Sequence, residues 1–224
     1  MAGFGRARRG PGAGDRQPGS DGTAAAGGSG RSGRAAAQPL DEQQLYNRAV
    51  ALLSRQMRTV AQLRRLLRAH AAPGADGEAA LGAALARLHD HGYLSDPRFA
   101  LSYATARKDT QHFGRRRIAQ ELLRKGVASE VITNQLDTAF QDVDEDAQAR
   151  AYLRRKRVPP LGGKDRVKDA RDAARVFRML LRAGFSPGTA TRAVRSLRSA
   201  AGAPLDDAAF TAMEEAAADG PDDA

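Results

Sequence analysis

Arginine is the residue type through which this chain could bind another molecule. Its guanidinium group carries N–H donors in a fixed fork that matches the oxygens of phosphates and carboxylates. Arg171, Arg175, Arg178 and Arg182 recur at helical spacing, with Val176, Phe177 and Leu180 roughly opposite. This pattern predicts a helix that packs by one face and presents a stripe of arginines on the other. The chemistry expected of such a stripe is anion binding.

Two further basic clusters extend this prediction. Arg116 and Arg124 share a helical face with Gln120, away from Ile118 and Leu122, and Arg154–Arg157 form a consecutive run. The candidate binding residues are Arg116, Arg117, Arg124, Lys125, Arg154, Arg155, Lys156, Arg157, Arg171, Arg175, Arg178 and Arg182. The alternative for any one of them is an ordinary solvated cation, because charge runs on helices are commonly solvated and cations are favoured at helix C-termini.

The distribution of charge favours binding over simple solvation. The chain has 36 Lys+Arg and 26 Asp+Glu, a net charge of +10. Residues 40–198 hold 30 of the bases and 17 of the acids, or +13, whereas residues 199–224 carry −7. A central segment of this charge repels itself unless it has an anionic partner. Nucleic acid, a nucleoprotein surface and an acidic protein all fit.

Enzyme chemistry finds no support in the residues. The chain has no Cys, and its four His are dispersed without metal-ligand spacing. Gly162-Gly163-Lys164 lacks the upstream glycine of a nucleotide-binding loop. We therefore predict no catalytic site, no metal and no cofactor. No run of 18 apolar residues exists, so we expect no membrane partner and, with no Cys, a cytoplasmic protein.

Stacking on nucleic-acid bases also looks weak from the sequence. The chain has no Trp, and only 5% of its residues are aromatic. Phe113 and Tyr93 are the only plausible exposed rings, and core packing is the favoured interpretation of Tyr93. Single-strand binders normally carry a platform of such rings. Phosphate contact without stacking remains open.

The elements that must position the arginines form an internal repeat. The motif Leu-Leu-Arg begins at Leu66, again at Leu122 and again at Leu180, spacings of 56 and 58 residues. A fixed period of this size is typical of tandem supersecondary units. The helical periodicity predicts an all-α fold: three tandem three-helix repeats in an elongated curved array with disordered termini. The expected segments are a disordered basic arm (1–39), repeats 1 to 3 (40–94, 95–141 and 142–198) and an acidic tail (199–224).

Local signals place the helix ends. Thr59 with Gln62 predicts a capping box, Ser129 is expected to be the N-cap of a helix, and Ser95-Asp96-Pro97 and Ser186-Pro187 predict further helix starts. Residues 73–77 contain Pro-Gly and Asp-Gly pairs and are expected to form a loop before the helix of Leu81. Gly126 and Gly184 are expected to end their helices with positive φ. Ala147, Ala151 and Tyr152 are the expected core face of the first helix of repeat 3.

The middle of the chain resembles a known family. Gly92–Ala100 (GYLSDPRFA) and Gly114–Val127 (GRRRIAQELLRKGV) are similar to the junction motif and the G-x-R-R-I-x-x-E-L-x-x-K-G-V stretch of the RecX family of recombinase regulators. The resemblance is specific over about residues 90–140 and collinear over 41–198. It implies a protein that docks in the helical groove of the RecA–DNA filament and usually inhibits RecA. Ala69-His70-Ala71 departs from the family, which has a basic-Gly-apolar turn there.

These observations together predict a regulatory protein, active in recombination, DNA repair and the SOS response. It would bind the RecA filament as a monomer, contact single- and double-stranded DNA non-specifically, and inhibit RecA recombinase, ATPase and co-protease activities. The first alternative is a non-specific DNA-binding helical protein without a dedicated protein partner. The second is an operator-binding repressor, because Ile118–Leu136 superficially resembles a helix-turn-helix whose first helix is too long.

Overall fold

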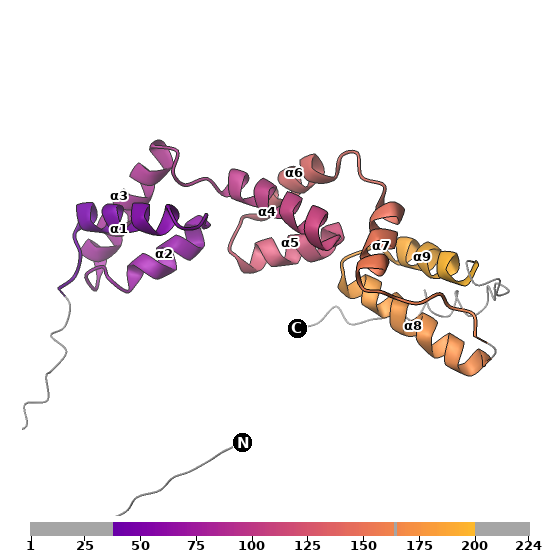
Figure 1. The fold of residues 1–224 in the computed structure, drawn as a ribbon. Coiled ribbons are helices and arrows are strands. Elements are labelled where there is room, and N and C mark those ends of the chain that lie inside the picture. The colour runs from indigo at the N-terminus through magenta and orange to yellow at the C-terminus, as the bar shows by residue number, and fades with distance from the viewer. Residues whose placement is uncertain (1–37, 164, 200–224) are drawn as a thin grey trace, which may run out of the picture. The chain divides into compact units, whose positions relative to one another are not determined.

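The computed structural model describes residues 38–163 and 165–199, which form nine α-helices and no β-strand. Figure 1 shows their arrangement along the chain. The predicted basic arm and acidic tail lie almost wholly outside the described residues. Repeat 1 contains α1 (Glu42–Leu53), α2 (Val60–Arg68) and α3 (Ala75–Asp90). Repeat 2 contains α4 (Asp96–Gln111), α5 (Arg115–Arg124) and α6 (Ser129–Phe140). Repeat 3 contains α7 (Glu145–Arg155), α8 (Arg166–Arg182) and α9 (Pro187–Ser199). The all-α fold of three three-helix repeats is therefore confirmed.

Most of the predicted helix starts are correct. Thr59 accepts from the backbone N–H of Gln62 at 3.1 Å, and the Gln62 side chain accepts from the Thr59 N–H at 3.3 Å, which completes the capping box. Ser95 caps α4, with Pro97 in its first turn, and Ser186 Oγ accepts from the N–H of Thr189 at 3.2 Å.

Two boundary predictions are wrong. Ser129 is the first residue of α6, and its N-cap is Ala128, which has no side chain able to accept a hydrogen bond. The loop expected over 73–77 is shorter, because α3 already starts at Ala75. Gly74, with φ of 87°, makes the turn alone. Gly77 lies inside the helix, where a β-carbon would collide with the carbonyl of Ala72.

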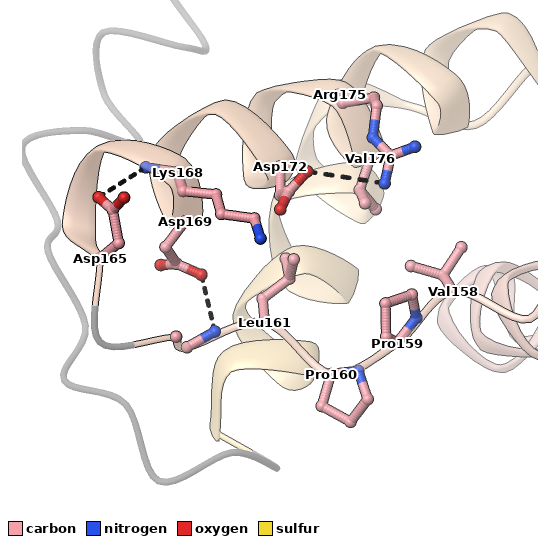
Figure 2. A pocket seen from close by; sticks show the side chains of 12 residues that line it. Val158, Pro159, Pro160, Leu161, Asp165, Lys168, Asp169, Asp172, Arg175 and Val176 are labelled. Carbon is pink, nitrogen blue, oxygen red and sulfur yellow. Dashed lines mark hydrogen bonds and ion pairs between the residues drawn. The ribbon is translucent and has the colours of Figure 1, made fainter.

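The carboxylate of Asp169 connects the segment between α7 and α8 to the helices of repeat 3. Asp169 accepts from the backbone N–H of Gly162 at 2.7 Å, a contact drawn in Figure 2, and from Nη2 of Arg198 at 2.7 Å. Both charged side chains are close to fully buried. Because buried charges are stable only when paired and hydrogen-bonded, this contact fixes the loop against α8 and α9.

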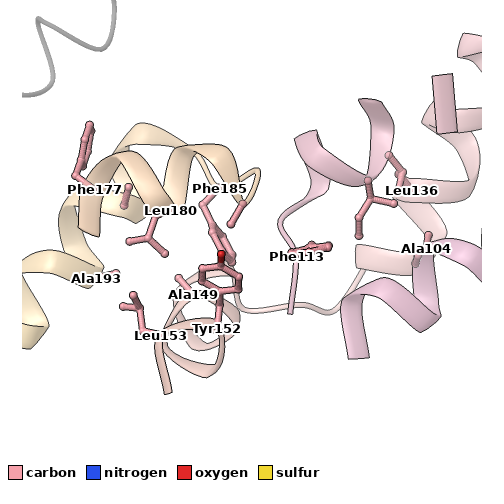
Figure 3. Close-up of a cluster of buried hydrophobic side chains, with 14 of the residues drawn as sticks. Ala104, Phe113, Leu136, Ala149, Tyr152, Leu153, Phe177, Leu180, Phe185 and Ala193 are labelled. Carbon is pink, nitrogen blue, oxygen red and sulfur yellow. The ribbon is translucent and has the colours of Figure 1, made fainter. Parts of the chain in front are cut away.

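The hydrophobic core forms two clusters. In repeats 1 and 2 the first and second helices both contact the third helix. In repeat 3, α7 and α8 both contact α9. Repeat 1 buries its own set of leucines, whereas repeats 2 and 3 share a cluster (Figure 3). Rings join the shared cluster: Phe113 and Tyr152 have centroids 6.2 Å apart, and Tyr152 and Phe185 5.9 Å.

The core face of α7 is rotated about the helix axis from the predicted face. Tyr152 is buried as expected, but Ala147 is exposed and Ala151 only half-buried. Ala149 and Leu153 take the buried positions. Leucine gains more from burial than alanine does, so the helix turns Leu153 toward the core.

The register of the repeat also needs a correction. The Leu-Leu-Arg motif equates Leu66 with Leu122, yet Leu66 is 38% exposed and Leu67 is fully buried. Counted from the N-caps Thr59 and Gly114, Leu67 and Leu122 occupy the same position. The reason is that α2 has 9 residues and α5 has 10. An alignment by the Leu-Leu-Arg motif is therefore shifted by one residue from an alignment by the buried positions of the two helices.

Repeats 2 and 3 meet where the end of α8 contacts the start of α5. The N–H of Gly114 donates to the carbonyl of Ala183 at 2.8 Å, and the N–H of Arg116 donates to that of Gly184 at 3.2 Å. The first N–H groups of a helix and its last carbonyls have no partners within the helix. Here each end satisfies the other, which explains how α5 begins without a capping side chain.

Repeats 1 and 2 meet by the same arrangement. The Thr59 hydroxyl donates to the carbonyl of Lys125 at 2.6 Å, and Gly126 lies directly against Ala61. Thr59 and Lys125 occupy the positions that Gly114 and Ala183 hold in the other junction. The C-terminal turn of each second helix therefore contacts the N-terminus of the second helix one repeat earlier. This head-to-tail order also places opposite ends of the helix dipoles together.

The departure of repeat 1 from the family motif has a local explanation. Gly126 and Gly184 have φ of 80° and 92°, as predicted, and each touches an earlier helix. Ala69-His70-Ala71 instead receives an extended segment: the N–H of Leu40 donates to the carbonyl of His70 at 2.7 Å, and Leu40 and Ala71 form a β-bridge. Within the described residues no helix precedes α1, so this turn has no helix to approach closely and does not require glycine.

Candidate anion-binding surface

The arginine stripe of α8 has the geometry that its spacing predicts. Arg171, Arg175, Arg178 and Arg182 are all exposed, whereas Ala173, Val176, Phe177 and Leu180 are buried. Arg175 lies 3.6 Å from Asp172, and this exposed ion pair is weak. The helix therefore packs by one face and presents guanidinium groups on the other.

Equivalent positions on α5 and α2 carry arginine as well. Counted back from Gly126 and Gly184, Arg124 matches Arg182, and Gln120 matches Arg178. Counted from the N-caps, Arg65 of α2 matches Gln120. We define the arginine track as the exposed arginines on this face of the second helices: Arg65 of α2, Arg116 and Arg124 of α5, and the α8 stripe Arg171, Arg175, Arg178 and Arg182. Because the two junctions repeat the same contacts, the equivalent faces follow one another from α8 through α5 to α2.

Arg65 was missed from the sequence. The one-residue shift between α2 and α5 hides its equivalence with the other positions of the track. The adjacent Arg64 and Arg65 are the signal that could have identified it, once the N-caps rather than the Leu-Leu-Arg motif set the alignment.

Two predicted binding residues are engaged inside the protein. Arg117 is half-buried, with its guanidinium 3.9 Å from the centre of the Phe113 ring and Nη1 donating to the carbonyl of Arg182 at 3.4 Å. Lys125 is half-buried, and its Nζ lies 5.0 Å from the centre of the Tyr103 ring. Arg117 thus contacts the end of α8 across the junction of repeats 2 and 3, and Lys125 lies against a ring of its own repeat. Neither residue is included in the arginine track.

Glu121 organises the side chains around Arg117. It accepts from the Tyr103 hydroxyl at 2.7 Å and from Nε of Arg117 at 3.2 Å, and Arg107 Nε lies 3.2 Å away. Burial by itself would raise the pKa of Glu121, but the hydrogen bonds from Tyr103 and Arg117 and the charges of Arg107 and Arg117 together lower it. The carboxylate thus holds two arginines in fixed positions at the base of α5.

Loss of this carboxylate should destabilise repeat 2. We expect Glu121→Gln to lower the free energy of unfolding by about 2 kcal/mol at neutral pH, because hydrogen bonds to charged groups are lost in a largely buried site. A lowered pKa stabilises the fold above the ordinary value of 4.5, and this contribution is lost as the pH falls through the folded-state pKa. Urea titrations should therefore show the difference from the parent shrinking below about pH 4.5. A constant difference down to pH 3 or so would contradict this role.

The run Arg154–Arg157 lies at the end of α7 and not on a second helix. All four residues are exposed, and Lys156 Nζ lies 5.7 Å from the centre of the Tyr152 ring. Burial raises the pKa of Tyr152, and the nearby charges of Arg117 and Arg155 oppose this shift. This cluster is a second basic area, because it lies at the end of the first helix of its repeat and the arginine track lies on second helices.

A hollow of about 310 Å³ lies between α8 and the segment 158–163 (Figure 2). Its walls include Asp165, Asp169 and Asp172 beside Lys168 and Arg175. The Gly162 N–H points at the carboxylate of Asp169, whereas a phosphate-binding loop must leave its N–H groups to the phosphate. The hollow therefore lacks the character of a nucleotide site.

The remaining described residues offer no other candidate site. No group of three or more His, Asp or Glu side chains in residues 38–163 and 165–199 is placed to hold a metal ion. Among the described helices, none combines the length and apolar character needed to cross a membrane.

The fold and surface define an all-helical repeat protein with an arginine-lined face. Residues 95–136 match the family described as RecX, second three-helix domain. A regulatory protein RecX of Chromobacterium violaceum is 40% identical over 143 residues, which cover 63% of this chain and 82% of that protein. One from Thermobifida fusca is 33% identical over 175 residues, covering 76% and 88%. The chain belongs to the RecX family of regulatory proteins.

The fold agrees with this assignment. The crystal structure of RecX from Lactobacillus salivarius superposes with a TM-score of 0.56 over 70% of this chain and 96% of that one, at 20% identity. A second crystal structure of a regulatory protein RecX gives 0.54 over 69% and 71%, at 23% identity. At these identities the structural likeness speaks for the fold alone.

Proposed function

We propose that this protein binds the RecA nucleoprotein filament and inhibits the recombinase, ATPase and co-protease activities of RecA. The observation that carries the proposal is the arginine track on three second helices joined head to tail. A filament presents anionic groups repeatedly along its axis, and a repeat array presents cations in the same manner. Membership of the RecX family supports RecA as the partner.

A feature of α5 favours a partner that contains protein. Leu123 is 51% exposed next to Arg124. DNA phosphates offer nothing to a leucine side chain, whereas a protein surface with an apolar pocket and an acidic rim complements both leucine and arginine. A nucleoprotein filament offers both kinds of surface.

The mechanism that we propose is steric and electrostatic. Contacts along successive repeats would span more than one RecA subunit and obstruct DNA strands and co-protease substrates in the groove. The protein would act without catalysing a reaction, as a cytoplasmic monomer.

Co-sedimentation tests this function. RecA filaments formed on single-stranded DNA with a non-hydrolysable ATP analogue should carry the protein into the pellet. This should occur even when there is much less of the protein than there are DNA binding sites. DNA alone and RecA alone should retain less of it at physiological salt. Equal retention on naked DNA and on filaments would instead support the alternative function, a non-specific DNA-binding protein.

The operator-binding alternative gains no support. In a helix-turn-helix the second helix reads base edges, mostly with arginine, lysine and polar side chains. Here that helix is α6, which contains no Lys or Arg and carries Glu130 and Asp137. Its buried residues Ile132, Leu136 and Ala139 pack into the core of repeat 2.

A further inference from the structure

The two aromatic residues singled out as possible exposed rings have opposite environments. Phe113 is only 6% exposed and lies in the shared core, so its predicted exposure is wrong. Tyr93, expected in the core, is 56% exposed. A large exposed ring on a chain with few aromatic residues is informative, because most such rings are buried.

Tyr93 is held rigidly despite its exposure. It follows Gly92, whose φ of 70° ends α3, and its N–H donates to the carbonyl of Leu88 at 2.9 Å. The next N–H, that of Leu94, donates to the same carbonyl at 3.3 Å, and the Leu94 side chain is buried. A locked turn with one side chain anchored in the core presents the other side chain in a fixed place. Such preorganisation lowers the entropic cost of binding.

Tyr93 ends a row of rings. The His91 ring lies edge to face with Tyr93, with centroids 6.3 Å apart, and with Tyr46, 5.7 Å apart. Tyr46 hydroxyl and His91 Nδ1 are 2.7 Å apart, which fixes the imidazole. The guanidinium of Arg87 lies 4.2 Å from the centre of the Tyr46 ring. We call these residues, together with Arg98, the Tyr93 platform.

Two arginines lie next to the row. Arg98 donates to the carbonyl of Gly92, the residue before Tyr93, and remains exposed. Arg87 donates to Oε1 of Gln43 at 2.7 Å, which holds it over Tyr46. An open ring face with a guanidinium beside it is the arrangement that proteins use for unpaired nucleotides: the ring stacks on the base, and the cation meets the phosphate.

We propose that the Tyr93 platform binds an unpaired nucleobase of single-stranded nucleic acid, by stacking of the base on Tyr93 with the adjacent phosphate at Arg98. Arginines that contact phosphates can bind single and double strands, because both carry phosphates. The platform needs a base that is free of its pair, so it gives the protein a preference for single strands. This inference concerns nucleic acid alone and does not depend on RecA as the partner.

The test uses the full-length chain and two DNA probes without RecA. One is a 15-nucleotide oligodeoxythymidine carrying a single 5-iododeoxyuridine, and the other is a 15-bp duplex. Tyr93→Ala should weaken single-strand binding on the order of tenfold and leave duplex binding unchanged. Tyr93→Phe keeps the ring and should bind the single strand like the parent. Irradiation of the iodinated probe should cross-link it to the peptide that contains Tyr93.

Several outcomes would overturn the proposal. Equal loss of single-strand and duplex affinity in Tyr93→Ala would assign Tyr93 to general phosphate binding. Cross-links confined to other peptides would place the base elsewhere. If Tyr93→Ala bound both DNA probes normally but failed to sediment with RecA filaments, the platform would be a protein contact. Because Tyr93 is exposed, an unchanged melting temperature is expected for both variants and confirms that they fold.

Discussion

Alanine at Gly184 should lower the free energy of unfolding by about 3 kcal/mol. Two causes add at this position. Gly184 has φ of 92°, which L-residues rarely adopt, and an added β-carbon would lie 2.3 Å from the backbone N of Arg117. The structure must therefore strain the turn and also open the junction between repeats 2 and 3.

Three other glycines separate the two causes. Gly74 has φ of 87° with open space around it, so Gly74→Ala should cost about 1 kcal/mol from the backbone alone. Gly114 has an ordinary φ of −73°, but its β-carbon would lie 2.3 Å from the Gly184 carbonyl, so Gly114→Ala should cost about 2 kcal/mol from crowding alone. Gly82 has neither problem and sits inside α3, so Gly82→Ala should stabilise by up to about 1 kcal/mol.

Urea denaturation followed by circular dichroism measures this series. The order of stability should be Gly82→Ala, then the parent, then Gly74→Ala, then Gly114→Ala and last Gly184→Ala. Equal effects at Gly74 and Gly184 would mean that the close approach at the junction contributes nothing, which would contradict the head-to-tail arrangement.

Removal of the α8 stripe should cause the largest loss of binding. With Arg171, Arg175, Arg178 and Arg182 all changed to alanine, we expect affinity for RecA filaments on single-stranded DNA to fall on the order of a hundredfold at low salt. Each lost phosphate contact should also reduce the slope of log affinity against log salt by roughly 0.7–0.9. Helicity should be unchanged, because alanine favours helix and the opposite face forms the core. Fluorescence anisotropy at several salt concentrations measures both quantities.

A charge-matched control shows whether position or net charge matters. Arg48, Arg55, Arg115 and Arg150 are exposed and lie outside the arginine track. Their replacement by alanine removes the same charge and should reduce affinity much less. If both quadruple variants lost affinity to a similar extent, the α8 stripe would contribute only through the net charge of the protein and not through its position.

Local signals in the sequence were sufficient for most of the fold. The Thr59 capping box, the Ser95-Asp96-Pro97 start and the glycines at 126 and 184 depend on neighbouring residues, and all four are present as predicted. The stripe on α8 was equally predictable, because helical periodicity alone decides which side chains share a face.

Contacts between distant segments decided what the sequence could not show. Phe113 has the polar neighbours of an exposed ring, but the junction with repeat 3 brings it against Tyr152 and Arg117. Tyr93 has the apolar neighbour of a core residue, but the positive φ of Gly92 directs Leu94 inward instead. Lys125 belongs to a basic run, but its ammonium group lies 5.0 Å from the centre of the Tyr103 ring, which comes from a different helix.

We propose that this protein acts on the RecA filament and not on DNA alone, and the rate of ATP hydrolysis by RecA on single-stranded DNA tests this proposal most directly. The protein should lower the steady-state rate of ATP hydrolysis when it is far below the concentration of DNA binding sites. The α8 quadruple variant should need a much higher concentration for the same effect. Inhibition that begins only when the protein approaches stoichiometry with DNA, or an unchanged rate at every concentration, would contradict the proposal.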